Sequence, residues 1–220
     1  MIAGMILAGL YLLLASRIIT KKLHKSGWQK QFQMVHKIIG ILFLILSGIH
    51  FILVIPLLDQ RPVVMTVTGA VMVLAAGVEA GSYLFRERFA KRWVWMHRGS
   101  AILLLICLLT HIGFGIVSLN QYKGRIESIE LKDINLNKIE DGSYMGEYDA
   151  GYIYARVVVT VSKHRLQDIQ IMEHKTEKGK SAEVITEQMI EQQRTNIDVI
   201  SGATNSSKVI EKAVCNALES

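Results

Sequence analysis

The first half of the chain consists of long apolar runs separated by short polar connections. Crossing about 30 Å of hydrocarbon takes roughly 20 helical residues, and four runs approach or exceed that length. They lie at about residues 1–20, 33–56, 63–85 and 94–118. In the first run the positive charges follow the apolar residues, which favours a retained anchor over a cleaved signal peptide. The pattern predicts a membrane-spanning all-α four-helix bundle over residues 1–119.

After Asn120 the pattern changes to one in which polar and apolar positions alternate. Residues 152–174, "YIYARVVVTVSKHRLQDIQIMEH", predict two strands that are joined by a polar turn at Lys163–Arg165. Residues 181–194, "SAEVITEQMIEQQR", predict an amphipathic helix with Ser181 at its N-cap.

A loop and a final helix, from about Ser206 to Leu218, follow these elements. Strands and helices in this order predict a small α+β domain at residues 141–220. Residues 120–140 are then expected to be a linker between this domain and the membrane part.

Charge divides at the same place as hydropathy. Residues 1–119 contain twelve Lys and Arg against three Asp and Glu, whereas residues 120–220 contain thirteen against sixteen. The net charge of +6 is therefore concentrated in the apolar half, and it gives no reason to expect a nucleic-acid partner. Basic residues gather in the connections at 17–37 and 86–98, while the connection between the second and third runs has only Arg61. By the positive-inside rule the two basic connections are cytoplasmic, so that both termini and the α+β domain lie outside the cytoplasm.

Two of the apolar runs carry histidines at the same separation. His36 and His50 are fourteen residues apart, as are His97 and His111. Fourteen helical residues make nearly four full turns and rise about 21 Å, so each pair lies on one face of its helix. In the predicted topology His36 matches the depth of His97, and His50 that of His111. This is the arrangement needed to hold two haems, each between two imidazoles.

The alternative for these histidines is a packing or proton-transfer role, which intramembrane histidines often have. Their spacing resembles that of the diheme b-type cytochrome domains of membrane-bound reductases, including the ferric-reductase-like group. The resemblance covers about residues 30–118 and implies His36, His97, His50 and His111 as haem ligands.

A polar loop before the last helix carries a second candidate site. In "DVISGATNSS", residues 198–207, a Gly-Ala turn presents a threonine hydroxyl at a helix N-terminus, whose N–H groups and dipole favour a phosphate. The plain alternative is a serine- and threonine-rich helix cap. The candidate cofactor-binding residues are Asp198, Ser201, Gly202, Ala203, Thr204 and Asn205.

Residues 141–218 resemble the FMN-binding domain shared by the C subunit of sodium-pumping NADH:quinone reductase, the G subunit of the Rnf complex and many extracytoplasmic flavoproteins. Three features match in order: "DGSYMGEYDAG", the strand pair, and "DVISGATNSS" before the last helix. The resemblance implies that a flavin transferase joins FMN to Thr204 through a phosphoester. It also implies that Ser201, Gly202 and Ala203 shape the loop and that Asp198 completes the modification motif.

Other residues fit several readings or exclude a class of cofactor. Glu79, inside the third apolar run, suits either a proton or quinone site or the inner interface. No Cys-x-x-Cys occurs, and Cys107 and Cys215 lie in different environments, so we expect neither a disulfide nor an iron–sulfur cluster. The chain also lacks a Gly-rich nucleotide-binding motif, so direct oxidation of NADH is not expected.

Together these features predict an oxidoreductase component that transfers electrons across the cell membrane. The expected donor is a quinol or a cytoplasmic reductase, and the expected route is through two b haems to covalent FMN and an extracytoplasmic acceptor. Two alternatives remain open: a flavin-carrying relay subunit of a larger respiratory complex, and a membrane-anchored flavin redox sensor or scaffold without haem.

Overall fold

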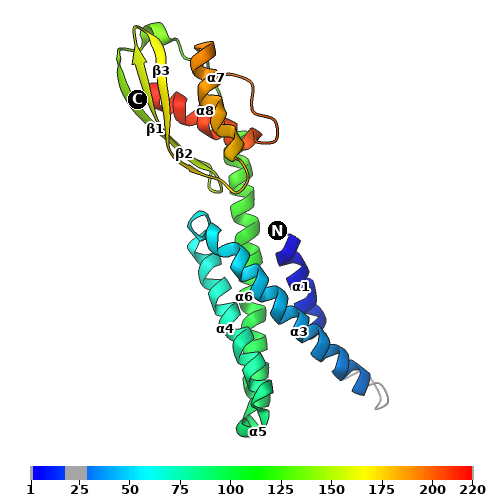
Figure 1. Ribbon diagram of the computed structural model, residues 1–220. Coiled ribbons are helices and arrows are strands. Elements are labelled where there is room, and N and C mark those ends of the chain that lie inside the picture. The colour runs from blue at the N-terminus through cyan, green and yellow to red at the C-terminus, as the bar shows by residue number, and fades with distance from the viewer. Residues whose placement is uncertain (1, 18–28, 220) are drawn as a thin grey trace. The chain divides into compact units, whose positions relative to one another are not determined.

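The computed structural model describes residues 2–17 and 29–219, and it divides the chain into two compact units (Figure 1). The first unit is Met1–Gly115 and the second is Ile116–Ser220. Four residues of the first basic connection, Lys21, Lys22, His24 and Lys25, lie outside the described residues.

The first unit is entirely helical in its described part. Its elements are α1 (Ile2–Ala15), α3 (Gln29–Val54), the 3₁₀ helix η2 (Ile55–Gln60), α4 (Val63–Leu84), the short α5 (Arg86–Phe89) and α6 (Arg92–Glu127), which continues into the second unit. Both prolines of the sequence lie where a helix begins: Pro56 is in the first turn of η2, and Pro62 is the N-cap of α4. Proline suits such positions because it has no N–H to donate and its φ is fixed.

Three of the described helical segments are long and apolar enough to cross a membrane. They are Lys30–Leu58, Val63–Leu84 and Arg92–Glu127, whereas the apolar part of α1, Ala3–Ala15, is shorter than a span requires. The expectation of four spans is therefore met for three helices, and the count of four is not established. These apolar helices indicate that the protein associates with a membrane.

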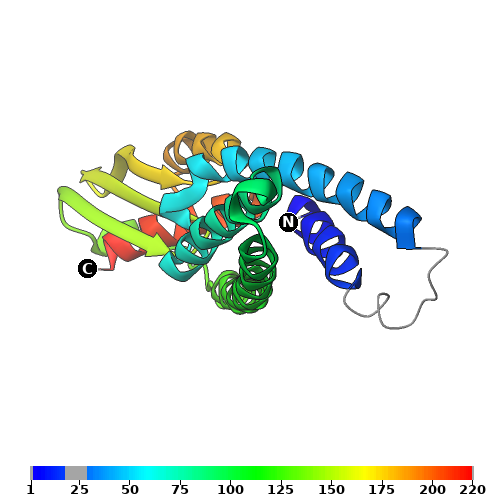
Figure 2. The same cartoon turned by 90° about the horizontal axis from the view of Figure 1, so that it is seen from below.

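The helices of the first unit share a small core and turn most of their apolar surface outward. The core contains Leu7, Tyr11, Phe43, Ala75, Ala76 and Leu104, which come from α1, α3, α4 and α6. The Tyr11 hydroxyl donates to the Ala101 carbonyl, and α1 lies beside α3 (Figure 2). Large side chains on the outer faces, such as Leu74 and Leu109, are 71% and 62% exposed. Such apolar surface suits contact with lipid rather than water.

The second unit is a three-stranded antiparallel sheet with helices on one face (Figure 1). The strands are β1 (Gly142–Asp149), β2 (Tyr154–Ser162) and β3 (Arg165–Lys175), in the order β1-β2-β3. The helices are η3 (Leu136–Lys138), η4 (Lys180–Val184), α7 (Ile185–Gln192) and α8 (Thr204–Leu218). Alternate residues of β2 face these helices and are buried, as a two-residue side-chain period requires: Ala155, Val157, Val159 and Val161.

The structure confirms the strand pair and corrects the elements around it. Lys163 and His164, at the turn between β2 and β3, have φ of 53° and 57°, as the tightest hairpin turns need. Ser181 is not an N-cap, because η4 and α7 have Gly179 and Val184 at those positions.

Three further elements of the second unit differ from the prediction. The expected helix 181–194 is a 3₁₀ turn followed by α7, and α8 starts at Thr204 rather than Ser206. Strand β1 was not expected, because its less exposed positions hold Gly142, Tyr144, Gly146 and Tyr148 instead of aliphatic residues.

Residues 116–140, which include the expected linker, belong to the second unit. Ile126, near the end of α6, is buried in the core of that unit, and Ile134, Leu136 and Ile139 pack against it. The Asp133 carboxylate also pairs with Arg194, with 2.8 Å between Oδ2 and Nε.

Candidate functional site

Residues 201–204, with the sequence SGAT, form a tight turn that leads directly into α8; we call it the SGAT turn. Gly202 has φ of +79°, a conformation that glycine adopts without steric cost, and the Ala203 amide donates to the Ile200 carbonyl at 3.0 Å. Ala203 is the N-cap of α8 and is buried, whereas Thr204 is the first helical residue and is exposed. The turn thus presents the Thr204 hydroxyl to solvent at a helix N-terminus.

The Ser207 side chain holds this turn from inside the helix. Its hydroxyl oxygen accepts from the Ile200 amide at 3.0 Å and donates to the Ala203 carbonyl at 3.2 Å. Ser207 is fully buried, so these two bonds are shielded from water. The first N–H groups of α8 have no carbonyl partner within the helix, which makes this end favourable for a phosphate.

The predicted cofactor-binding residues lie together at this end of α8. Ser201 and Gly202 are exposed in the turn, and Ala203, Thr204 and Asn205 follow in the cap and the first turn of the helix. Asp198 lies earlier in the same loop and is also exposed.

A segment after β3 packs closely against the same helix end. The Thr176 hydroxyl lies 3.1 Å from the Ser206 hydroxyl and accepts from the Gly179 amide at 2.9 Å. A Cβ atom at Gly179 would collide with the Ser206 side chain, so only glycine permits this approach. Sequence reasoning missed Thr176 and Gly179, because their contact with α8 joins residues about 30 positions apart.

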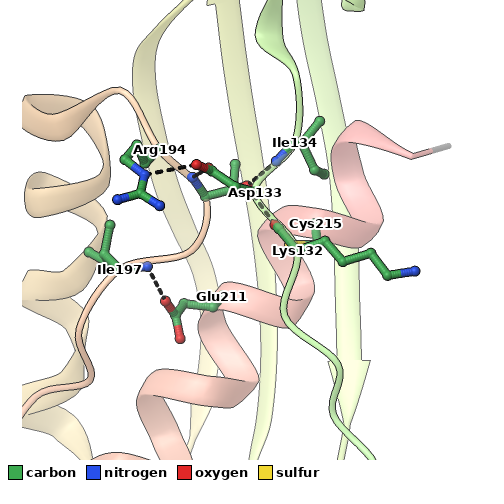
Figure 3. Close-up of polar contacts among 8 residues, drawn as sticks. Lys132, Asp133, Ile134, Arg194, Ile197, Glu211 and Cys215 are labelled. Atoms are coloured by element: carbon green, nitrogen blue, oxygen red, sulfur yellow. Dashed lines mark hydrogen bonds and ion pairs between the residues drawn. The ribbon is translucent and has the colours of Figure 1, made fainter.

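The Glu211 side chain of α8 holds the middle of the loop between α7 and α8 (Figure 3). Its side chain is fully buried; Oε1 accepts from the Ile197 amide at 3.1 Å, while Oε2 has no hydrogen-bond partner in the described part of the chain. Burial raises the pKa of the Glu211 carboxyl from its ordinary value of 4.5 to about 7, although the bond from Ile197 acts in the opposite direction. A helical wheel would have revealed this residue, because Ser207, Glu211 and Cys215 are spaced four apart on the buried face.

The start of the loop is tied to the segment that follows α6 (Figure 3). Thr195 donates its amide proton to Asp133 Oδ1 at 3.0 Å and its hydroxyl proton to the Lys132 carbonyl at 2.9 Å. The Thr195 hydroxyl oxygen also accepts from the Ile134 amide at 2.8 Å. The loop before Thr204 is therefore fixed at its start by Thr195, in its middle by Glu211 and at its end by Ser207.

The second candidate site is formed by histidines of α3 and α6. His36 and His97 are brought together, with ring centroids 6.3 Å apart and ring planes at 74°. Two metal–imidazole bonds of about 2 Å each, with the half-widths of both rings, span about 6 Å. The Nδ1 atom of His97 is buried and lacks a hydrogen-bond partner among the described residues. The spacing of this pair fits one metal ion held between two imidazoles.

The other two histidines are on the same helices but are not brought into ring contact in the described structure. His111 Nδ1 lies 2.9 Å from the Thr68 hydroxyl of α4, and both His50 and His111 are half-buried. The described residues contain no group of three or more His, Cys, Asp or Glu that would hold a metal ion by themselves. A haem iron needs only two protein ligands, so a pair of histidines can hold a haem without such a group.

The remaining sequence candidates are Glu79 and the two cysteines. Glu79 lies half-buried within α4. Cys107 and Cys215 are both free, as expected. Burial raises the pKa of the Cys215 thiol, and its Sγ faces the Lys132 carbonyl at 3.6 Å, as suits a packing residue.

Comparison with known proteins gives one match. The family model for the FMN-binding domain matches residues 151–219. No curated protein and no solved structure matches the chain. The matched residues run from the β1–β2 turn to the end of α8 and contain the whole SGAT turn. This part of the chain is thus an FMN-binding domain, which points to flavin-based electron transfer.

Proposed function

We propose that this protein is a membrane electron-transfer flavoprotein that carries FMN covalently on Thr204. The observation that carries the proposal is the exposed Thr204 hydroxyl, presented by the SGAT turn at the N-terminus of α8, inside the part of the chain that matches the FMN-binding family. A flavin transferase would form the phosphoester from an activated flavin phosphate: the Thr204 oxygen bonds to phosphorus, the bond to the activating group breaks, and that group leaves while the hydroxyl proton passes to a base. FMN, when bound, supplies a group that accepts and releases electrons.

The surroundings of Thr204 suit a phosphoester. The free N–H groups of the first turn of α8 and its helix dipole favour the negative charge that the phosphate retains. Gly202 allows the turn its left-handed conformation, and Ser207 holds the turn in place. Covalent attachment also prevents loss of the flavin by dilution outside the cell, where the domain is expected to lie.

In this proposal, four histidines of the membrane unit would hold two b haems. His36 and His97 would hold one, which their centroid distance of 6.3 Å supports, and His50 and His111 the other. Haem, when bound, would supply one-electron chemistry, and two histidine ligands for each haem would favour electron transfer over oxygen binding.

The proposed direction of transfer is from the cytoplasmic side or from quinol to an external acceptor. The exposed basic residues Arg86 and Arg88 on α5, with Arg92 at the start of α6, support a cytoplasmic location for this connection. If the histidines only pack, the protein would instead be a flavin-carrying scaffold or sensor. If it needs partner subunits to reduce an acceptor, it would be a relay in a larger complex.

Replacement of Thr204 by alanine tests the attachment. In cells that contain a flavin transferase, Thr204→Ala should abolish flavin fluorescence of the protein band on a denaturing gel, because no hydroxyl remains to form the ester. The control is Thr160→Ala, a threonine on β2 whose hydroxyl lies 3.2 Å from the Ser143 hydroxyl, away from the SGAT turn in the sequence. A second experiment tests the location of the domain. A protease added to intact cells should release the fluorescent domain from the membrane part, because the domain is proposed to lie outside the cytoplasm.

Two results would contradict this proposal. Flavin that persists on the Thr204→Ala protein would move the attachment to another residue. A fluorescent domain that is cut only after the cells are broken would place it on the cytoplasmic side.

A further inference from the structure

Two tyrosines lie beside the residue that follows Thr204. The Asn205 amide donates from Nδ2 to the Tyr122 hydroxyl at 2.8 Å. The Tyr122 ring packs edge-on against Tyr152, with centroids 5.4 Å apart and planes at 62°. Tyr122 belongs to the last turns of α6 and Tyr152 to the turn between β1 and β2, so three segments of the second unit meet at the N-terminus of α8.

Polar contacts beside this tyrosine pair connect the two segments that carry the rings. Asp149 Oδ1 accepts from the Gly151 amide at 2.7 Å, and Gly151 has φ of +103°, which favours glycine. The Tyr148 hydroxyl donates to the Arg125 carbonyl at 3.1 Å, which ties β1 to the end of α6. The turn that carries Tyr152 is thus fastened to the helix that carries Tyr122.

The two rings are not simply part of the core. Tyr122 packs against the core cluster on one side, but both Tyr122 and Tyr152 remain half-exposed. The hydroxyl of Tyr122 is directed to Asn205 rather than to a core group. A half-exposed aromatic pair with fixed positions is a suitable contact surface for another flat aromatic ring, because such rings gain from edge-on and offset packing.

We propose that Tyr122 and Tyr152 form the contact surface for the isoalloxazine ring of the FMN on Thr204, with Asn205 as a positioning residue for Tyr122. This inference rests on the proposed attachment. The phosphate and ribityl groups form a short tether, so the ring system must come to lie close to Thr204. Tyr122 lies outside residues 151–219, so the family match does not include this half of the surface.

The test uses the fluorescence of the covalent flavin in the full-length protein purified in detergent. Phenol rings in contact with a flavin quench its fluorescence by donating an electron to the excited flavin, whereas phenylalanine does not. The double variant Tyr122→Phe/Tyr152→Phe keeps both rings, so it should still fold and still carry flavin. Its fluorescence per covalent flavin, relative to the same sample after denaturation, should rise several-fold. The circular dichroism of the flavin absorption bands should change as well.

The control is Tyr144→Phe, a tyrosine of β1 whose hydroxyl donates to the Glu140 carbonyl at 2.8 Å. Its flavin fluorescence and dichroism should equal those of the wild type. A second variant, Asn205→Ala, should raise the fluorescence less than the double variant does, because both phenols remain.

The outcomes separate this inference from the attachment on which it depends. Covalent flavin with unchanged fluorescence and dichroism in the double variant would overturn the tyrosine surface alone. A purely structural role of the tyrosines would give that result, with at most a lower melting temperature. Wild-type protein without covalent flavin would overturn the attachment, and the tyrosine surface with it.

Discussion

Glu211 shows how one side chain fixes the loop that presents Thr204. It is fully buried on α8 and accepts a hydrogen bond from the Ile197 amide, which belongs to the loop that follows α7. Burial favours the neutral form of the Glu211 carboxyl, and this effect outweighs the opposite effect of the nearby Lys208 charge. The neutral carboxyl still accepts from Ile197 through its carbonyl oxygen, so the contact itself does not need the charge.

The shifted pKa of Glu211 predicts that the loop is held less firmly at high pH. The folded-state pKa is about 7 against an ordinary 4.5, so the folded state binds more protons between these values. The stabilisation is complete below about pH 4.5 and is lost as the pH rises through about 7. At about 1.4 kcal/mol for each unit, its size is on the order of 3 kcal/mol.

Hydrogen–deuterium exchange of a peptide that covers residues 195–203 measures this effect in the full-length protein. After correction for intrinsic rates, wild-type protection should fall between pH 5 and pH 8. Glu211→Gln, which stays neutral, should keep its protection, and the exposed Glu219→Gln should behave as the wild type does. Equal protection of the wild type at both pH values would show that the carboxyl does not titrate in this range.

At the residue scale, the sequence pointed to Thr204 as a candidate but not to the residues that contact its turn. Thr204 stands in a short contiguous motif, which can be read without knowing the fold. Tyr122 reaches Asn205 across 83 positions, and Gly179 meets Ser206 across 27. Contacts of this kind leave no local pattern, so only the folded structure reveals them.

At the element scale, the domain depends on a close crossing of β1 by α8. Gly146 is buried in β1, and a Cβ atom there would collide with the Ala213 carbonyl oxygen and the Ala217 amide nitrogen of α8. Asn216 adds a bond from Nδ2 to the Glu147 carbonyl at 2.9 Å. Because the colliding atoms are backbone, the helix cannot yield by a change of rotamer.

We therefore expect Gly146→Ala to destabilise the second unit by about 2 kcal/mol or more, the size of effect that overpacking produces. Gly142→Ala on the same strand is the matched control, since its Cβ would meet Tyr144 at an ordinary 3.5 Å. Pulse proteolysis of the full-length protein in increasing urea should show a lower unfolding midpoint for residues 116–220 in Gly146→Ala only. Equal midpoints for the two variants would mean that the crossing adjusts.

Element prediction succeeded where the pattern was strongly periodic. The alternation of β2 and the polar turn after it gave the hairpin, and the long apolar runs gave α3, α4 and α6. It failed for β1, whose place in the sheet comes from pairing with β2 and from packing against α8, with only Tyr144 and Tyr148 as large side chains against the core. The prediction also placed residues 181–184 in the α-helix, whereas Lys180–Val184 form a 3₁₀ helix. The composition of these residues does not distinguish them from the helix that follows.

At the scale of the whole molecule, the proposed haems require that α3 and α6 come together in the membrane unit. His111→Ala and His50→Ala should each lower the haem content from about two to about one per chain, because each removes one ligand of the same pair. Covalent flavin should be unaffected. The control is His164→Ala in the β2–β3 turn, whose Nδ1 contacts the Ile139 carbonyl at 3.0 Å.

A dithionite-reduced minus oxidised visible spectrum, with haem quantified against protein, measures this prediction. Sharp b-type bands that halve in His50→Ala and His111→Ala, but not in His164→Ala, would support the pairing. Unchanged haem in both variants would refute it. A wild-type spectrum that shows flavin bleaching alone would favour the flavin-carrying scaffold without haem.

The sequence alone determined the features that depend on local pattern. Apolar runs of sufficient length marked the membrane helices, a two-residue alternation marked the β2–β3 hairpin, and the SGAT motif marked the FMN-binding part, which the family match confirms. Only the tertiary structure decided what surrounds Thr204. The buried Glu211 beneath the loop, the tyrosine pair at Asn205 and the close crossing at Gly146 each join segments distant in sequence. Such contacts depend on how side chains fill space after the chain has folded, and no local periodicity records them.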